Sequence, residues 1–436
     1  FLARWPQTPL TERTQAHFLY RGAATRVNLA GDMNNCSADA LSMNQASATT
    51  LWYVTLALEN DARLDYKFVL NGSSWILDPR NPFTCAGGFG ANSELRMPAY
   101  VPPPEVAYDP AIAHGVLFDT TFASAIMGYS RRLRVYTPPG YETDHRRYPL
   151  LLVHDGLDYL NLGQMQQVLD NLIAQKKITP LIAAFLPAVR REEEYAGYLQ
   201  ESFGRFISRE LLPFLDTRFR TLTDARHRAT MGASNGGNIS LYLGYAFPDQ
   251  FGNVIAQSSY VQPGLQQAFQ TQAKKELRFY LDIGTYDIPL LIPMVRNLKE
   301  TLQSKGYRYL YGEYHEGHSW GNWKAHIDDA LIFIFSGDET GVAKAPARPV
   351  DPVVLASYPN PFNDSTTIRI LLPHDDHVVL NVYNLIGSEA ARLHNGFLHR
   401  GAHTFYLAGP ALPSGLYFCE LETSRQVLTL KLICLR

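Results

Sequence analysis

Apolar and polar residues alternate in short runs over residues 1–100. Runs such as HFLYRG, RVNLAG, LWYVTLAL and LDYKFVLNG place an apolar side chain at roughly every second position. Turn-forming segments, including GDMNN, NGSS and DPRNP, separate these runs. A period of two is that of a strand with one buried face, and short strands at close spacing are typical of an antiparallel sandwich. We therefore predict an all-β sandwich domain over residues 1–100.

The pattern changes after the proline-rich segment YVPPPEVAYDP at 100–110, which we interpret as a linker because proline interrupts regular structure. Over residues 101–340, apolar runs such as YPLLLVHDG, PLIAAFLP, FGNVIAQSS and LRFYLDIG alternate with helical segments. Near-continuous apolar strands separated by helices are typical of a mostly parallel sheet covered on both faces. This region is predicted to be a doubly wound α/β domain.

A second linker, AKAPARP at 343–349, precedes another set of short alternating runs. TTIRILL, VVLNVYN, HTFYLAG, LYFCEL and VLTLKLICL again follow a period of two. We predict a second all-β sandwich over residues 350–436.

Composition limits the classes of protein to which the chain can belong. Its 436 residues exceed one ordinary core, and 46% hydrophobic with 18% charged residues is typical of a folded protein. A net charge of −2 gives no reason to expect nucleic acid as a partner. No apolar run approaches the roughly 20 residues of a membrane-spanning helix. The chain starts at Phe1 without a leader, so we expect that a signal peptide has been removed.

The cysteines lie near the two ends, as Cys36 with Cys85 and Cys419 with Cys434. They lack the C-x-x-C spacing of a zinc site, and no metal or cofactor is predicted. Each pair could form a disulfide in an oxidising compartment, which the sequence leaves open.

The segment RATMGASNGG places Ser234 in a Gly-x-Ser-x-Gly pattern at the end of an apolar run. Where such a pattern joins a strand to a helix, the serine is exposed on a sharp turn as a nucleophile. Gly232 and Gly236 would leave room for the closely approaching backbone segments. The alternative is a glycine-rich turn without a catalytic role.

A base and an acid should follow the serine in the chain. HEGHSWGNW offers His318, which we prefer because it follows Gly317 in a loop, and His315 as the second choice. Their H-x-x-H spacing is not the helical H-E-x-x-H of a metalloprotease. LRFYLDIGTYDIP offers two aspartates. We prefer Asp287, in the loop after the strand, to Asp282 within it, although Asp287 could instead cap a helix.

An oxyanion hole needs two backbone N–H groups. Asn235, directly after the serine, would supply one. The other would come from Gly156 or Leu157, in the loop after the strand run LLLVH. Ser234, Asp287, His318 and these donors together predict a serine hydrolase.

Five ordered motifs over residues 115–336 resemble the putative-esterase family of α/β-hydrolases, which includes enterochelin esterase, esterase D and feruloyl esterases. They are VYTPPGYETDHRRYPLLLVHDG, RREEEYAGYLQESFGRFISRELLPFLDTRF, MGASNGG, GTYD and EGHSWGNW. The resemblance implies the same triad and a site rim formed by Arg191, Glu194 and Tyr195, a segment that could equally be a solvated charge run. Together with Asp158, Tyr159 and Trp320, these rim residues are our predicted substrate-binding residues.

The terminal blocks resemble other modules. VNLAGDMNN and LDYKFVLNGSSWILDPRNP are similar to a glycogen-binding, immunoglobulin-like carbohydrate-binding module, which implies Trp52 and Trp75 as possible glycan-binding residues. Cys36 stands where such modules often have tryptophan. YPNPFNDSTTIRI, VYNLIGSEA and LPSGLYFCELET are similar to the sorting domain of the type IX secretion system. This implies export to the cell surface or medium, with the secretion machinery as a partner.

The combined prediction is a secreted serine carboxylic-ester hydrolase that forms an acyl-enzyme. Feruloyl or acetyl esters of polysaccharide are the favoured substrates, with other short acyl or aryl esters and siderophore esters as alternatives. A catalytically inactive glycan-binding surface protein is the alternative from another class, and acyl transfer to a sugar is a third.

Overall fold

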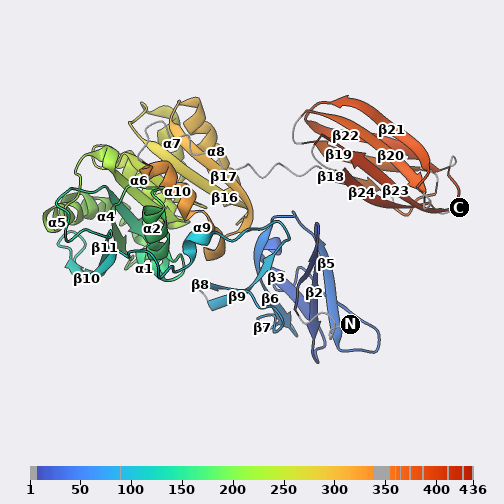
Figure 1. The fold of residues 1–436 in the computed structure, drawn as a ribbon, viewed down its shortest axis with the longest axis horizontal. Coiled ribbons are helices and arrows are strands. Elements are labelled where there is room, and N and C mark those ends of the chain that lie inside the picture. Colours follow the sequence, from blue (N-terminus) through green and yellow to red (C-terminus); the bar gives the residue numbers. More distant parts are fainter. Residues whose placement is uncertain are drawn as a thin grey trace. The chain divides into compact units, whose positions relative to one another are not determined.

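The computed structural model describes residues 7–88 and 90–336, and then 354–358, 360–363, 365–372, 375–384, 387–409, 412–424 and 427–434. The chain divides into two compact units, Phe1–Arg348 and Pro349–Arg436, shown as a ribbon in Figure 1. Each unit has its own buried apolar clusters.

A large mixed sheet forms the centre of the first unit. Its strands run in the order β10 (Val116–Ala123), β11 (Ser130–Thr137), β13 (Ile182–Leu186), β12 (Leu150–His154), β14 (Arg228–Ala233), β15 (Asn253–Gln257), β16 (Arg278–Tyr286) and β17 (Arg308–Gly317). Pairing is antiparallel at β10 and β11 and parallel from β13 to β17. The predicted α/β fold with a mostly parallel sheet is confirmed.

Helices cover both faces of this sheet because alternate strand residues point to opposite sides. Leu151 and Val153 of β12 pack in one cluster, and Leu150 and Leu152 pack in another. The first face is covered by α1 (Gly156–Asn161), α2 (Met165–Ala174), α9 (Trp320–Ala325) and α10 (Ile327–Phe335). The opposite face is covered by α4 (Gln200–Phe206), η3 (Ile207–Leu211), α5 (Leu212–Arg218), α6 (Asn235–Ala246), α7 (Pro263–Thr271) and α8 (Leu291–Ser304). The short helices α3 (Arg191–Tyr195) and η4 (Ala225–His227) lie in loops between strands.

The N-terminal residues form the predicted β-sandwich around Phe18, Leu29, Trp52 and Phe68. One sheet contains β1 (Leu10–Glu12), β2 (Gln15–Arg21), β5 (Leu51–Ala57) and β4 (Asn44–Gln45). The other contains β3 (Val27–Gly31), β6 (Arg63–Leu70), β7 (Ser74–Ile76), β8 (Thr84–Gly87) and β9 (Gly90–Arg96), with η1 (Asp32–Asn34) after β3.

This sandwich is joined to the α/β region. Strand β6 pairs in parallel with β17 at Arg63 and Glu316, which makes the two sheets continuous. The proline-rich segment between them includes η2 (Pro104–Val106) and packs on α2, where the side-chain amide of Asn171 donates to the carbonyl oxygens of Glu105 and Ala107. The segment predicted as a linker is therefore docked, and the regions on either side of it belong to one compact unit.

The second unit contains two antiparallel sheets around a shared apolar cluster. One has the order β18 (Val354–Tyr358), β19 (Ser365–Leu372), β22 (Gly401–Ala408), and the other β21 (Glu389–Leu398), β20 (Asp376–Asn384), β23 (Gly415–Glu422), β24 (Val427–Cys434). Cys36, Cys85, Cys419 and Cys434 are free thiols in the structure, so neither of the two disulfides that the sequence left open is formed. Within the described residues, no helix is long and apolar enough to cross a membrane.

Candidate active site

Ser234 lies on a sharp turn between β14 and α6. Its φ of 58° and ψ of −122° are rare for a residue with a side chain, and such strained positions cluster at functional sites. A Cβ at Gly232 would lie 2.3 Å from the carbonyl oxygen of Gly236, so this approach requires glycine. The Ser234 N–H donates to the carbonyl of Gln257 on the neighbouring strand β15. This is the strand–turn–helix context that the motif needs.

His318 and Asp287 follow the ends of two adjacent parallel strands, β17 and β16. His318 Nδ1 lies 2.7 Å from Asp287 Oδ1, and Asp287 is buried. With Nδ1–H donating to the carboxylate, Nε2 keeps a lone pair that can accept a proton. The His318 ring also packs edge-on against Trp323. Ser234 and His318 line one cleft of about 620 Å³.

The second-choice acid and base lie elsewhere. Asp282 is fully buried within β16, where its carboxylate accepts from the Gln257 side chain and from the Ser258 N–H. Burial raises the pKa of Asp282 to about 6. His315 is paired with Asp61 of the N-terminal sandwich at 2.6 Å. Of the candidate pairs, Asp287 and His318 are the two residues that the structure brings together beside Ser234.

The predicted oxyanion donors lie at two helix N-termini. Helix α6 begins at Asn235 and α1 begins at Gly156, followed by Leu157. The first N–H groups of a helix have no partner within it, and the N-terminal end of the helix dipole favours negative charge. Gly156 and Leu157 lie between Asp155 and Asp158, which both line the cleft. Asn235, Gly156 and Leu157 are thus first-turn residues of helices that begin next to the cleft-lining residues Ser234 and Asp155.

Of the six predicted substrate-binding residues, three line the cleft and three do not. Asp158, Arg191 and Trp320 line it. Tyr159, Glu194 and Tyr195 are fully buried, so direct contact with substrate is not open to them in this structure.

Arg191 and the three buried residues of this set form contacts that support one side of the cleft. Arg191 binds Asp155 through two nitrogens, at 3.0 and 2.8 Å, and the Tyr195 hydroxyl accepts from the Asp155 N–H. Glu194 pairs with buried Arg131, and Tyr159 donates to the Gln257 side chain. The Arg-x-x-Glu-Tyr element thus fixes the turn at Asp155, which has a φ of 51°, directly before the predicted oxyanion donors.

The opposite wall of the cleft comes from the N-terminal sandwich, through Asp32, Cys36, Asp65, Lys67, Trp75 and Asn92. Trp75 is 46% exposed and offers a ring to the cleft. Trp52, the other predicted glycan-binding residue, is 6% exposed in the core of the sandwich. A buried ring cannot stack on a sugar, so the structure contradicts that role for Trp52.

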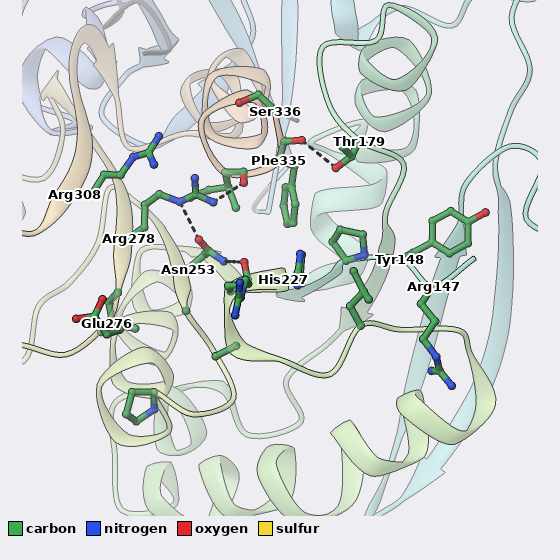
Figure 2. A pocket seen from close by; sticks show the side chains of 18 of the residues that line it. Arg147, Tyr148, Thr179, His227, Asn253, Glu276, Arg278, Arg308, Phe335 and Ser336 are labelled. Carbon is green, nitrogen blue, oxygen red and sulfur yellow. Dashed lines mark hydrogen bonds between the residues drawn. The ribbon is translucent and has the colours of Figure 1, made fainter. Parts of the chain in front are cut away.

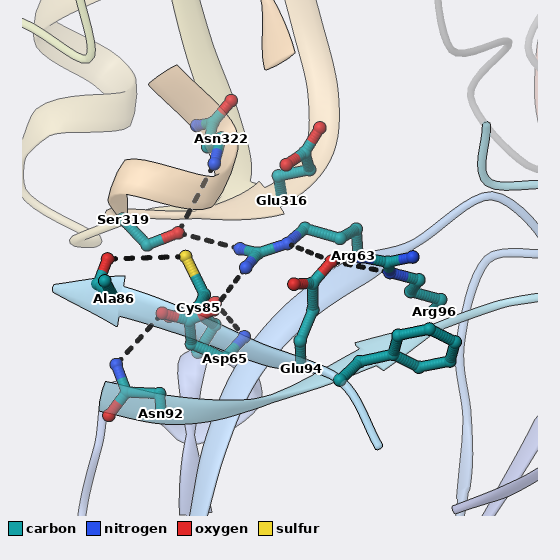
Figure 3. Close-up of polar contacts among 12 residues, drawn as sticks. Arg63, Asp65, Cys85, Ala86, Asn92, Glu94, Arg96, Glu316, Ser319 and Asn322 are labelled. Carbon is teal, nitrogen blue, oxygen red and sulfur yellow. Dashed lines mark hydrogen bonds and ion pairs between the residues drawn. The ribbon is translucent and has the colours of Figure 1, made fainter. Parts of the chain in front are cut away.

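The sandwich also contacts the loop that carries His318 (Figure 3). Arg63 is fully buried, donates to Ser319 Oγ at 3.0 Å and pairs with Asp65 and Glu94. A Cβ at Gly321 would lie 1.8 Å from Arg63 Cζ, and one at Gly317 would lie 2.0 Å from Asp32 Cγ. Sequence reasoning missed Arg63 and Asp32. Gly317 and Gly321, near His318, indicate that another segment approaches this loop closely, but they do not indicate which residues that segment contributes.

Among the described residues, no group of three or more His, Cys, Asp or Glu side chains is arranged to hold a metal ion.

Comparison with known proteins identifies two matching families in different parts of the chain. Residues 124–334 match the model of the family described as putative esterase, and residues 356–435 match that of the secretion system C-terminal sorting domain. The uncharacterized protein YjcH of Bacillus subtilis is 28% identical over 233 residues, which are 50% of this chain and 97% of that protein. The endo-1,4-beta-xylanase/feruloyl esterase of Xylanibacter ruminicola is 30% identical over 158 residues, 34% of this chain and 22% of that enzyme.

A solved structure extends the likeness to the N-terminal sandwich. Ferric enterobactin esterase from Salmonella typhimurium superposes with a TM-score of 0.66 at 20% identity, over 76% of this chain and 98% of that one. At this identity the likeness concerns the fold. Residues 124–334 are therefore an esterase region, that of a carboxylic ester hydrolase, and residues 356–435 add a secretion system C-terminal sorting domain.

Proposed function

We propose that the chain is a serine esterase with Ser234, His318 and Asp287 as its triad. The observation that carries the proposal is that Ser234, on its strained turn, lines the same cleft as His318, whose Nδ1 is held by buried Asp287. Ser234 Oγ attacks the ester carbonyl while His318 Nε2 takes its proton, and the same proton then goes to the departing alcohol. Water, deprotonated by His318, releases the acyl group and restores Ser234.

The charge that develops on the carbonyl oxygen needs a fixed partner. The N–H of Asn235 and that of Gly156 or Leu157 supply it in this proposal, from the ends of α6 and α1. Such donors need no reorganisation during the reaction, and losing one costs about 3 kcal/mol in known enzymes. The Arg191–Asp155 pair holds the second donor segment in place.

The proposed substrates are acyl esters of polysaccharides, such as feruloyl or acetyl esters. The cleft of about 620 Å³ is within the range of ligand-binding clefts. Trp75 and Trp320 line it together with polar side chains such as Asn92 and Asp158, which suits a ligand with rings and hydroxyl groups. One relative is named an endo-1,4-beta-xylanase/feruloyl esterase and others are named iron(III) enterobactin esterases, so the choice of polysaccharide esters is supported by the residues that line the cleft and by the sorting domain. The sorting domain supports export by a type IX system to the cell surface or medium.

The test is hydrolysis by wild type and by Ser234→Ala of p-nitrophenyl acetate, methyl ferulate, a feruloylated arabinoxylan oligosaccharide and a cyclic catecholate ester of serine. We expect the feruloylated oligosaccharide to have the highest kcat/KM, and Ser234→Ala to lose at least about a thousandfold in kcat. Ser202→Ala removes a hydroxyl on α4 that contacts Arg205 and leaves activity unchanged.

Full activity of Ser234→Ala would overturn the assignment of Ser234 as the nucleophile. Preference for the catecholate would favour a siderophore esterase. Binding to xylan without turnover of any ester would favour the inactive glycan-binding protein.

A further inference from the structure

A second cavity, of about 1090 Å³, opens at the edge of the sheet opposite to Ser234 (Figure 2). Pro149, His227, Gly252 and Leu277 line it, and each directly precedes a strand of the parallel sheet, at its amino end. Ser234 follows the carboxyl end of β14. A molecule bound in this cavity would therefore leave the catalytic cleft free.

Arg278, at the start of β16, is fixed in this cavity by two neutral acceptors. Its Nε donates to Asn253 Oδ1 at 2.9 Å, and one terminal nitrogen donates to the Ile334 carbonyl at 2.6 Å. Asn253 is itself held, because its side-chain nitrogen donates to the carbonyls of Arg226 and Arg228. These two hydrogen bonds from the side-chain nitrogen orient the Asn253 amide so that its Oδ1 faces Arg278, as Figure 2 shows. The guanidinium is thus held in place without being neutralised.

A second cation lies beside it. Arg308 begins β17 and is the register partner of Arg278, and both guanidinium carbons lie within 6 Å of the centre of the Phe333 ring, at 5.9 and 5.6 Å. Within the described part of the chain, neither arginine forms an ion pair with a carboxylate, although Asp249 and Glu276 also line the cavity. Burial and the neighbouring Arg308 lower the pKa of Arg278 to about 10.

Two of the other arginines at this cavity differ in this respect, because Arg146 is paired with Asp144 and Arg226 with Asp224. Arg147 donates to the carbonyl oxygen of Thr221. Two adjacent guanidinium groups without a carboxylate repel each other, and the aromatic ring they share offsets only part of that repulsion. An oxyanion between them would remove it and would accept the free N–H groups of both forks.

We propose that Arg278 and Arg308 form a binding site for an oxyanion carried by a sugar, either the carboxylate of a uronic acid or a phosphate ester. The cavity is far larger than a free oxyanion needs, and the half-buried side chains of Pro149, Pro180 and Leu222 provide apolar surface for a ring. The site is separate from the catalytic cleft and does not depend on the function proposed for Ser234. It would hold an acidic glycan on the enzyme during repeated turnover elsewhere.

The test is calorimetric titration of the full chain with trigalacturonic acid, galactose 6-phosphate, inorganic phosphate and neutral galactose at one fixed ionic strength. We expect one of the charged saccharides to bind with a Kd in the millimolar range or below, and more tightly than phosphate or galactose. The saccharide that binds identifies the oxyanion. Ser234→Ala should bind as wild type does.

Three variants locate the site. Arg308→Gln, at an exposed position, and Arg278→Gln should each weaken binding about tenfold or more. Arg226→Gln removes a charge from the same rim, but from an arginine already paired with Asp224, and should leave the affinity within about twofold. Without ligand, Arg308→Gln should melt at the same or a higher temperature than wild type, because the repulsion is relieved, whereas loss of a structural contact would lower Tm.

No binding of either charged saccharide at millimolar concentration would overturn the proposal. So would charged saccharides that bind no better than inorganic phosphate, or equal weakening by Arg226→Gln and Arg308→Gln.

Discussion

Asp287 and Asp61 each pair with a histidine, but only the pair of Asp287 includes a histidine that lines the cleft of Ser234. Each places a carboxylate oxygen on a histidine Nδ1, at 2.7 Å for Asp287 with His318 and 2.6 Å for Asp61 with His315. Asp287 is buried beside the cleft, whereas the Asp61 side chain is 48% exposed. Of these two histidines, only His318 lines the cleft that Ser234 also lines. We therefore base the proposed catalytic role of His318 on its location and not on its carboxylate partner alone.

We therefore predict that Asp287→Asn lowers kcat by about 10⁴-fold, because the amide no longer stabilises the protonated imidazole or its productive tautomer. KM should change little. The control is Asp61→Asn, which alters the matching pair and should leave kcat within a fewfold of wild type. Steady-state kinetics on p-nitrophenyl acetate measures both, and equal losses in the two variants would contradict the assignment.

Asp328 supplies a pH-dependent prediction. It lies in the first turn of α10, where burial and the nearby Asp329 and Glu105 raise its pKa to about 6 from an ordinary 3.8. Between these values the folded protein holds a proton that the unfolded chain has lost. Stability from this group therefore falls as pH rises from about 4 through 6.

Asp328→Asn removes this titrating group. Wild type loses stability as pH rises from 4 to 7 and the variant lacks this loss, so the free energy of unfolding of the variant should rise relative to that of wild type over this range. The difference between the two proteins should be small at pH 4. Urea unfolding at a series of pH values measures it. Asp39→Asn, at an exposed ion pair with Arg26, is the control and should show little change. A difference that does not vary with pH would contradict the prediction.

At the scale of elements, β6 and the loop after β17 determine how the site is held. Arg63 on β6 connects Asp65 and Glu94 of its own sheet to Ser319, the residue after His318. Ser319 in turn caps α9, accepting from the Asn322 N–H. The loop of His318, the proposed catalytic histidine, is thus held by the neighbouring sandwich as well as by its own sheet.

We predict that Arg63→Lys lowers kcat between about ten- and a hundredfold with little effect on KM. The lysine keeps the buried charge beside Asp65 and Glu94 but lacks the planar fork that reaches Ser319 at the same time. Arg96→Ala is the control, because Arg96 also pairs with Glu94 without an observed bond to the histidine loop. Unchanged kcat in a folded Arg63→Lys protein would rule out the positioning role.

Whether a feature of the site could be predicted depends on how far apart in the sequence its interacting residues lie. The turn at Ser234, the choice of Asp287 over Asp282 and the choice of His318 over His315 rest on neighbouring residues and on strand ends, which a sequence displays. The contact of Arg63 with Ser319 joins residues 256 apart, and nothing local to either indicates the other. Likewise, Trp52 and Trp75 both lie in strands of one sandwich, and only its packing decides which ring is buried.

At the scale of the whole molecule, the chain is built from two units with different internal connections. The N-terminal sandwich and the α/β region share a continuous sheet, a cleft, the hydrogen bond from Arg63 to Ser319 and the pair of His315 with Asp61. The C-terminal unit has its own apolar cluster of β20, β23 and neighbouring strands. Units with separate cores can fold independently.

We therefore expect that a chain ending at Arg348 keeps kcat/KM on p-nitrophenyl acetate within about twofold of the full chain and unfolds at the same temperature as the corresponding transition of the full chain. A chain that lacks residues 7–100 should lose most of this activity, because Arg63 and one wall of the cleft go with it. Equal loss of activity from the two truncations would contradict the division.

The bond between Arg63 and Ser319 also has a consequence for the newly made polypeptide. Its two ends are separated by almost the whole first unit, so it cannot form until synthesis has passed the last strand of the sheet. Contacts of such sequence separation form late and slowly. A first unit that is incomplete or partly folded therefore lacks this contact to the loop of His318. We expect ester hydrolysis to begin only when the fold of Phe1–Arg348 is complete, whether or not the C-terminal unit has been made.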